Sequence, residues 1–160
     1  MIVVSDASPI IGLAAIGQLG LLRDLYDRTL IPEEVRAEVL RAPHRPGADE
    51  LRAAHWIEVR ASTPGPLFEE LRAILHKGEA EALTLAVETH ADLVLMDERR
   101  GRREAARLGL TPIGVLGVLI EAKDAEYIAR VRPHLDALHT QAGFRFDDAL
   151  RRRVLSAAGE

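Results

Sequence analysis

The sequence predicts an α/β fold in which helices cover both faces of a central, mainly parallel sheet, followed by a helical C-terminal tail. Short apolar runs such as Ile2–Val4 and Leu93–Met96 alternate with longer segments whose apolar residues recur at helical spacing. Alternation of strands with helices is typical of a parallel sheet with three α/β/α layers. With 160 residues and 48% hydrophobic content, the chain is long enough for one complete core. We therefore expect one domain over residues 1–160, with its core over about 1–120 and a helical extension over about 121–160.

The expected elements follow from local signals. Strands are predicted at 1–5, 29–31, 56–59, 92–96 and 111–113, where short apolar or alternating runs occur. Ser8 and Pro9 resemble the cap and first residue of a helix, Pro32 opens another, and Gly78 marks a break before a strongly helical segment. The predicted helices are 9–16, 21–26, 32–40, 50–55, 67–75, 79–89, 98–108, 115–122, 126–139 and 147–155.

Composition excludes several functional classes. The chain has no Cys, which rules out a disulfide framework, a thiolate metal site and a Cys nucleophile. Its start lacks the basic residues of a signal peptide, and its apolar runs are far shorter than the ~20 residues of a membrane span. A formal net charge of −4 argues against a protein that coats nucleic acid through bulk positive charge. We expect a cytoplasmic protein without membrane contact.

Four carboxylates lie where the predicted elements would bring them to one pocket. Asp6 and Asp97 each follow an apolar strand, and Glu38 and Glu79 lie on predicted helices. The carboxyl ends of parallel strands form the edge at which open α/β sheets bind ligands. About four negative charges at one place are unstable unless protons or a hard cation neutralise them, and oxygen ligands favour Mg²⁺ or Mn²⁺. This pattern indicates metal-dependent chemistry on a phosphate.

Each acid also has a structural explanation when taken alone. Asp6 could cap the helix that follows it, Glu79 in a first helical turn complements the helix dipole, and Glu38 could be an ordinary solvated acid. Two apolar strands that both end in Asp are less easily explained by capping. The Asp6–Asp97 pair therefore favours a functional site.

Two clusters of arginines are further candidates. Arg99, Arg100, Arg102 and Arg103 directly follow Asp97, where they could attract a phosphate backbone or simply form a solvated helix face. For Arg151–Arg153, near the C-terminus, the solvated face is the favoured interpretation.

Five motifs in order resemble a PIN domain, the fold of VapC-type toxin ribonucleases, and are most similar to a branch of uncharacterised prokaryotic PIN proteins. Each motif alone is weakly specific, whereas five with this order and spacing are fairly specific. The resemblance covers residues 1 to about 120, and the helical tail is also similar. The motifs are VSDASPI at 4–10, IPEEVRAEV at 31–39, HKGEAEAL at 76–83, LMDERRGR at 95–102 and IGVLGVL at 113–119.

The resemblance implies that Asp6, Glu38, Glu79 and Asp97 are the acidic residues that hold Mg²⁺ or Mn²⁺. It also implies hydrolysis of RNA phosphodiesters to a 5′-phosphate and a 3′-hydroxyl, without a protein nucleophile. The expected neighbours of the site, which would contact substrate, are Ser5, Ser8, Glu98, Arg99 and Arg102.

One departure from the branch concerns Val115, which stands where a Thr is usual. The missing hydroxyl could have contacted substrate or metal-bound water, so the departure bears on turnover more than on metal binding. The toxin resemblance also implies a homodimer and a small antitoxin partner. Apolar residues at helical spacing in the tail favour core or dimer surface over an antitoxin groove; they are Ile128, Val131, Leu135 and Leu138.

Two other functional classes stay open. A haloacid-dehalogenase-like phosphatase would use a strand-end Asp as nucleophile, but it needs a second Asp two residues later, where this chain has Ser8. A non-catalytic module that binds nucleic acid or protein is supported by Val115 and by the acidic net charge. The preferred prediction is a metal-dependent ribonuclease.

Overall fold

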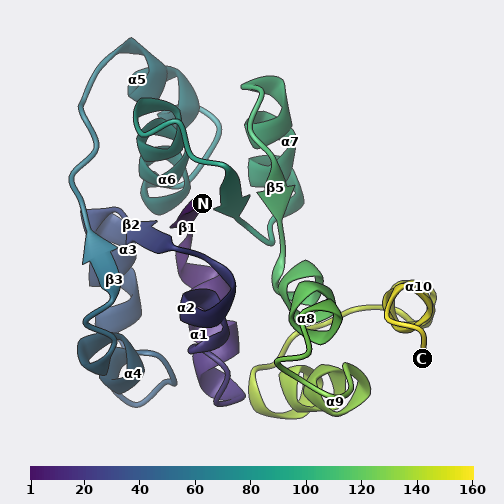
Figure 1. Ribbon diagram of the computed structural model, residues 1–160. Coiled ribbons are helices and arrows are strands. Elements are labelled where there is room, and N and C mark those ends of the chain that lie inside the picture. Colours follow the sequence, from purple (N-terminus) through teal and green to yellow (C-terminus); the bar gives the residue numbers. More distant parts are fainter.

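The computed structural model describes residues 1–160 and contains one five-stranded, wholly parallel sheet (Figure 1). The strands lie in the order β3-β2-β1-β4-β5. Val4 in the central strand is in register with Leu30 on one side and with Val94 on the other. The bounds are β1 Ile2–Ser5, β2 Arg28–Ile31, β3 Ile57–Val59, β4 Leu93–Leu95 and β5 Pro112–Ile113. The predicted α/β class with a parallel sheet is confirmed.

Ten helices surround the sheet. Helices α5, α6 and α7 cover one face, at the top of Figure 1, and α1, α3 and α8 lie on the other side of the sheet. Their bounds are α1 Ala7–Ala15, α2 Leu21–Leu25, α3 Glu33–Leu40, α4 Ala48–Ala53, α5 Pro66–Arg72, α6 Lys77–Glu88, α7 Arg99–Arg107, α8 Val115–Asp124, α9 Arg132–Gln141 and α10 Asp148–Ala157.

Both faces of the sheet are buried, which explains why its central strands are apolar throughout. Val3 and Leu95 point into a large core cluster together with helices α1, α3, α8 and α9. Their neighbours in the chain, Val4 and Val94, point into a second cluster formed with α5, α6 and α7. Side chains that alternate between two cores fix the register of each strand, since a slip by one residue would exchange the faces.

Two predicted helix starts are wrong. Helix α1 begins at Ala7, so Asp6 and not Ser8 occupies the cap position, and Ser8 lies in the first helical turn. Helix α6 begins at Lys77, so Gly78 lies inside the first turn and does not break the helix. The reason in the second case is packing, because the backbone at Gly78 approaches the side chains of Glu38 and Val35 too closely for a larger residue to fit freely.

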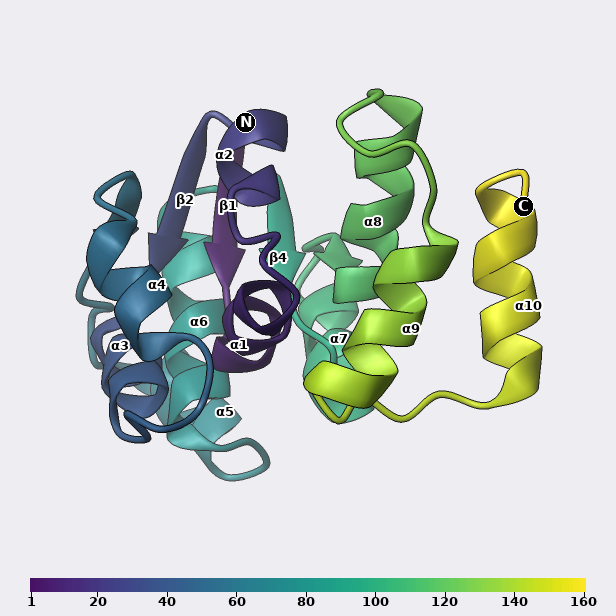
Figure 2. The ribbon, with the colours of Figure 1, turned by 90° about the horizontal axis from the view of Figure 1, so that it is seen from below.

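The helical tail packs against the first core cluster. The predicted helix over 126–139 is wrong at its start: Glu126 has a left-handed backbone (φ 63°) that follows the end of α8, and α9 begins only at Arg132. The four tail residues expected in a core or dimer surface, Ile128, Val131, Leu135 and Leu138, are all buried in this cluster. Figure 2 shows α10 on the outside, beyond α8 and α9. None of the ten helices combines the length and the apolar character that a membrane span needs.

Candidate active site

The two strand-end aspartates lie at the same edge of the sheet because β1 and β4 are parallel neighbours. Ser5 pairs with Leu95, and the backbone N–H of Asp6 donates to the carbonyl oxygen of Leu95 across 2.9 Å. Asp97 follows β4 after one intervening residue, Met96. Sheet topology therefore brings together two carboxylates that are 91 positions apart in the sequence.

Asp6 is the most buried of the four acids, with 5% of the residue exposed. The pKa of Asp6 is raised to about 7, mainly by burial and further by the negative charges of Glu79, Glu38 and Asp97, while the hydrogen bond from the N–H of Ala7 lowers it. A carboxyl group whose ionisation is opposed by three other carboxylates shares one electrostatic environment with them. The charges of the other three predicted acids therefore influence the ionisation of Asp6.

Glu38 reaches this region from α3, across the N-terminal turn of α6. The two helices meet where Gly78 has no side chain: the place that a Cβ would take lies 3.2 Å from Glu38 Oε2 and 3.7 Å from Asp6 Oδ1. Gly78 thus leaves a small space that is lined by two carboxylates. An oxygen-ligated cation needs such a space, since Mg²⁺–oxygen distances are about 2.1 Å.

Asp97 is held by two helices. The backbone N–H of Val115, at the start of α8, donates to Asp97 Oδ1 across 2.9 Å, and the Ser8 hydroxyl donates to Oδ2 across 3.2 Å. Burial raises the pKa of Asp97, and these two hydrogen bonds and the charge of Arg102 lower it. Because each carboxylate oxygen can accept a further contact, Asp97 keeps the capacity to bind a cation or water.

Glu79 lies in the first turn of α6, where its side chain accepts a weak hydrogen bond of 3.4 Å from the N–H of His76. Burial raises its pKa, and the charges of Glu98 and Glu38 raise it further. Glu98 caps α7 and is exposed. Glu79 and Glu98 both line a cleft of about 730 Å³ between α5 and α7, so Glu79 is the one of the four acids that faces this cleft.

The residues expected to contact substrate are distributed on different sides. Arg99 lines the cleft between α5 and α7, whereas Arg102 turns away from it and donates to the carbonyl oxygen of Met96 across 3.1 Å. Arg102 lines a second hollow together with Asp97 and with Leu150 of α10. The Ser5 side chain is fully buried and donates to the carbonyl of Asp6, so it supports the backbone and has no surface to offer a substrate.

The chemistry of the four acids fits Mg²⁺ or Mn²⁺ because all their donor atoms are oxygens and their charges oppose one another. As placed, no three of the acidic or His side chains stand close enough together to hold one ion. Binding of an ion would therefore have to draw these carboxylates inwards. Asp6, Glu38, Glu79 and Asp97 are the residues that would hold it.

The family comparison agrees with this architecture. The family model described as "DUF3368: PIN domain" matches residues 2–160. The chain belongs to the PIN-domain family. PIN domains are generally nucleases. Among solved structures, a PilT N-terminus domain protein, SSO1118, from the hyperthermophilic archaeon Sulfolobus solfataricus P2 has a TM-score of 0.61 and 20% identity, over 76% of this chain and 93% of that chain. That similarity supports the PIN fold, and none of the curated proteins compared with the chain matches it.

The sequence did not indicate a role at this PIN-domain site for several residues. Gly78 and Gly114 matter because of what a side chain there would displace: a Cβ at Gly114 would lie 2.8 Å from Asp97 Oδ1. The Val115 amide contributes through its backbone, which no side-chain pattern reveals. Arg72, the last residue of α5, and Ile74, just after it, also line the cleft, although no local pattern marks them as parts of a site.

Proposed function

We propose that this PIN domain is a ribonuclease that depends on Mg²⁺ or Mn²⁺ and hydrolyses phosphodiester bonds of RNA. The observation that carries the proposal is the gathering of carboxylates at the carboxyl edge of the sheet: Asp6 is buried beside β4, Glu38 approaches it across Gly78, and the charges of Glu79, Glu38 and Asp97 add to the effect of burial on its pKa. Buried carboxylates that oppose one another's ionisation are an unfavourable arrangement for stability alone, and a divalent cation relieves it.

Each group of residues at the site has its own role in the proposed hydrolysis. Asp6, Glu38, Glu79 and Asp97 would hold the ion, while Ser8 and the Val115 amide keep the Asp97 carboxylate oriented. When bound, the ion supplies an acidified water and positive charge beside the phosphate. Arg99 lines the cleft with Glu79, and Arg102 lines a second hollow with Asp97; both would stabilise the charge on the phosphate oxygens.

Cleavage of a labelled single-stranded RNA by the purified chain tests this proposal. We expect cutting with Mn²⁺ or Mg²⁺, no cutting with excess EDTA, and a large loss in the Asp97→Asn variant. Asp49→Asn, at an exposed position on α4, is the matched control and should cut like the wild type. Cutting that persists in EDTA, or in Asp97→Asn, would contradict the proposed chemistry.

A second function is favoured by one observation. Both oxygens of Asp97 already accept hydrogen bonds from the protein, as those of a purely structural acid would. A PIN-like module that binds RNA or protein without cutting would keep Asp97 for this purpose. In the cleavage assay such a module binds RNA but leaves it intact at every metal concentration.

The proposed partners follow from the resemblance to toxin ribonucleases. They are RNA as substrate, a second copy of the chain in a homodimer, and a small antitoxin encoded nearby. Light scattering of the purified chain tests the dimer, and co-expression with the product of the adjacent reading frame tests the antitoxin. A monomer at all concentrations would remove the dimer from the proposal.

A further inference from the structure

We infer that a single strand of RNA reaches the acids through the cleft between α5 and α7, with its phosphates on arginines and a base against Ile74. This inference rests on the proposed function and specifies the path of its substrate. We call the surface the α5–α7 trough. It is lined by Arg72, Ile74, Arg99, Arg100 and Arg103, and the acids Glu79 and Glu98 also lie in its lining.

The arginines of the trough have no carboxylate partners. None of Arg72, Arg99, Arg100 and Arg103 has an acidic oxygen within the 4.0 Å of an ion pair. The next arginine of the same helix, Arg107, has two such partners, Glu104 at 2.6 Å and Glu70 at 2.8 Å. Four guanidinium groups that face solvent without an ion-pair partner outnumber the two carboxylates of the same lining and form a surface for an anionic chain.

Two of these guanidinium groups are held in place by the backbone between α5 and α6. Arg72 donates to the carbonyl oxygen of Leu75 across 2.9 Å, and Arg100 from α7 donates to that of Ile74 across 3.3 Å. Each bond uses one of the five N–H donors of a guanidinium, so the others remain for phosphate oxygens. Arginines that are already positioned lose less conformational entropy when a ligand binds.

Ile74 adds an apolar contact in the middle of this basic surface. It is 42% exposed and is one of only four large hydrophobic side chains that are prominently exposed. A simple phosphate or an acidic peptide makes no use of such a side chain, whereas the flat face of a nucleobase can pack against it. A neighbouring hollow shares Arg72 with the trough and adds the apolar side chain of Phe68, together with Glu69 and with Lys77, which pairs with Glu34.

The opposite side of the acids offers no comparable path. The hollow beside Asp97 contains one arginine, Arg102, and is walled by Leu150 and Val154 of α10. The trough, by contrast, lies on the side of the sheet covered by α5, α6 and α7 (Figure 1). A duplex keeps its bases stacked inside and would leave Ile74 without a partner, so the occupant is single-stranded.

Binding of a labelled single-stranded RNA of about twelve nucleotides, measured by fluorescence anisotropy in EDTA, tests the trough separately from cutting. The Arg72→Ala/Arg103→Ala variant should weaken binding at least tenfold and reduce the slope of log K against log salt by about 1.4, for two lost phosphate contacts. Ile74→Ser should weaken binding several-fold without changing this slope. Circular dichroism melting curves confirm that each variant is folded.

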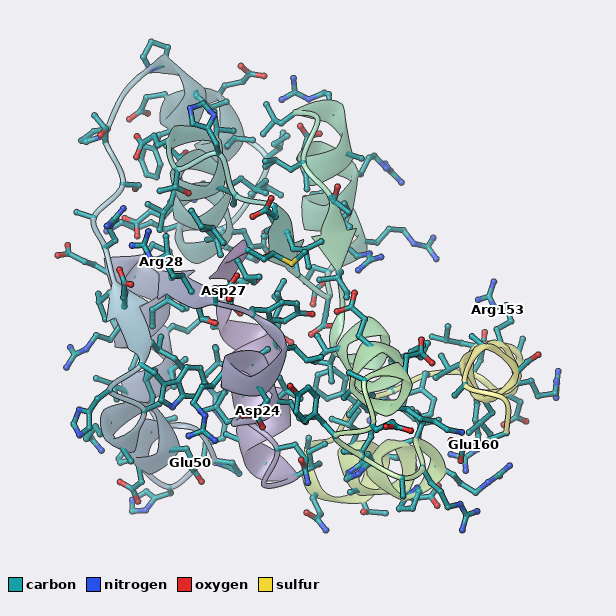
Figure 3. All side chains as sticks on the ribbon, viewed as in Figure 1. Asp24, Asp27, Arg28, Glu50, Arg153 and Glu160 are labelled. Carbon is teal, nitrogen blue, oxygen red and sulfur yellow. The ribbon has the colours of Figure 1, made fainter.

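Matched controls come from residues outside the trough. Arg153 lies on α10 and projects away from the rest of the chain in Figure 3, and Val59 is 44% exposed at the edge of the sheet. Arg153→Ala and Val59→Ser should therefore bind RNA like the wild type. Binding that depends equally on Arg153 would show that overall charge, and not the trough, holds the strand.

The outcomes separate this inference from the proposed function. If the trough variants bind as tightly as the wild type, or if a duplex binds as tightly as the single strand, the inference that RNA binds in the trough is wrong. The proposal of nuclease activity is not affected by that result. If RNA binds through the trough but is never cut with Mn²⁺, the trough stands and the nuclease proposal fails. Failure of the wild type to bind RNA, with an acidic peptide bound in its place, overturns both.

Discussion

The first amide of helix α8, on Val115, donates to Asp97 Oδ1 across 2.9 Å, while the Val115 side chain has no exposed surface and packs in the core. The sequence had suggested that Val115, in place of the usual Thr, removes a hydroxyl from the substrate side of the site. In the fold, position 115 serves Asp97 through its backbone, which any residue except Pro supplies. The site therefore does not depend on a hydroxyl at this position for the orientation of Asp97.

The residue before this amide limits how close Asp97 can come. A Cβ at Gly114 would lie 2.8 Å from Asp97 Oδ1 and 3.2 Å from Nη1 of Arg102. We expect Gly114→Ala to displace the carboxylate, to lower the free energy of unfolding by about 1–3 kcal/mol and to weaken Mn²⁺ binding. Urea unfolding and calorimetric titration measure the two effects. Gly65→Ala is the control, since a Cβ there meets nothing within 4 Å; equal effects of both substitutions would show that Asp97 is not constrained by Gly114.

A substitution at Gly78 should affect Mn²⁺ binding without a comparable effect on the stability of the fold. Ala is favoured over Gly inside a helix by roughly 0.5–1 kcal/mol, but a methyl group at position 78 would fill the space between Glu38 and Asp6. The close approach of this methyl group to Glu38 offsets the helix preference, so we expect Gly78→Ala to change the melting temperature little and to lose Mn²⁺ affinity and RNA cutting. Differential scanning calorimetry with and without Mn²⁺ measures both properties. Wild-type Mn²⁺ affinity in this variant would place the ion elsewhere.

The fold was largely predictable from the sequence, whereas the geometry of the site was only partly so. Apolar runs such as Val3–Val4 identify buried strands, and strand-end carboxylates such as Asp6 indicate the edge at which they gather. The start of α9 was missed because the apolar spacing of Ile128 and Val131 continues through a segment that is not helical. Apolar spacing indicates which residues are buried but not whether the backbone is helical. Here the left-handed backbone of Glu126 follows the end of α8 and separates it from α9.

What the sequence could not reveal are contacts between distant elements. Arg99 and Arg102 are three positions apart and were both expected beside the site, yet they line two different hollows. Arg102 is held by the carbonyl of Met96, whereas Arg99 faces the cleft bounded by α5. The direction of each side chain depends on packing around α7, which a single sequence does not encode in any local pattern.

The raised pKa of Asp6 makes stability depend on pH. Its pKa is about 7 in the folded chain and 3.8 as a free group, so the folded state binds the proton more tightly. The free energy of unfolding in the absence of metal should therefore fall as pH rises from about 4 to about 7. In Asp6→Asn this loss is absent, and at pH 8 the variant should be more stable than the wild type by about 3–4 kcal/mol.

Urea unfolding at pH 4 and at pH 8, with EDTA, measures this difference. Asp49→Asn on the exposed surface should follow the wild type at both pH values. Saturating Mn²⁺ should stabilise the wild type at pH 8 and leave Asp6→Asn nearly unchanged, because the ion neutralises the charge that the variant lacks. Parallel pH profiles of Asp6→Asn and wild type would show that the pKa of Asp6 is not raised in the folded chain.

Glu160, labelled in Figure 3, connects α10 to the start of α9. Its side chain accepts from the N–H of Val131 at 2.6 Å and of Arg132 at 3.2 Å, and from Nζ of Lys123 at 3.0 Å. The Val131 hydrogen bond, with those from Lys123 and Arg132, lowers the pKa of Glu160 to about 2. The stability that Glu160 contributes is thus fully present above its free pKa of 4.5 and lost as pH falls towards 2.

Glu160→Gln should consequently lower the melting temperature at pH 7 by more than at pH 3, because the neutral amide accepts weaker hydrogen bonds and pairs with no cation. Melting curves by circular dichroism at the two pH values measure this. Glu126→Gln makes the same chemical change at an exposed position nearby and should leave the melting temperature unchanged. Because none of the hydrogen bonds of Glu160 involves an acid of the site, metal-dependent cutting of RNA by Glu160→Gln should match that of the wild type below its melting range. A loss of cutting at low temperature would instead show that α10, whose Leu150 and Val154 wall the hollow beside Asp97, is coupled to the active site.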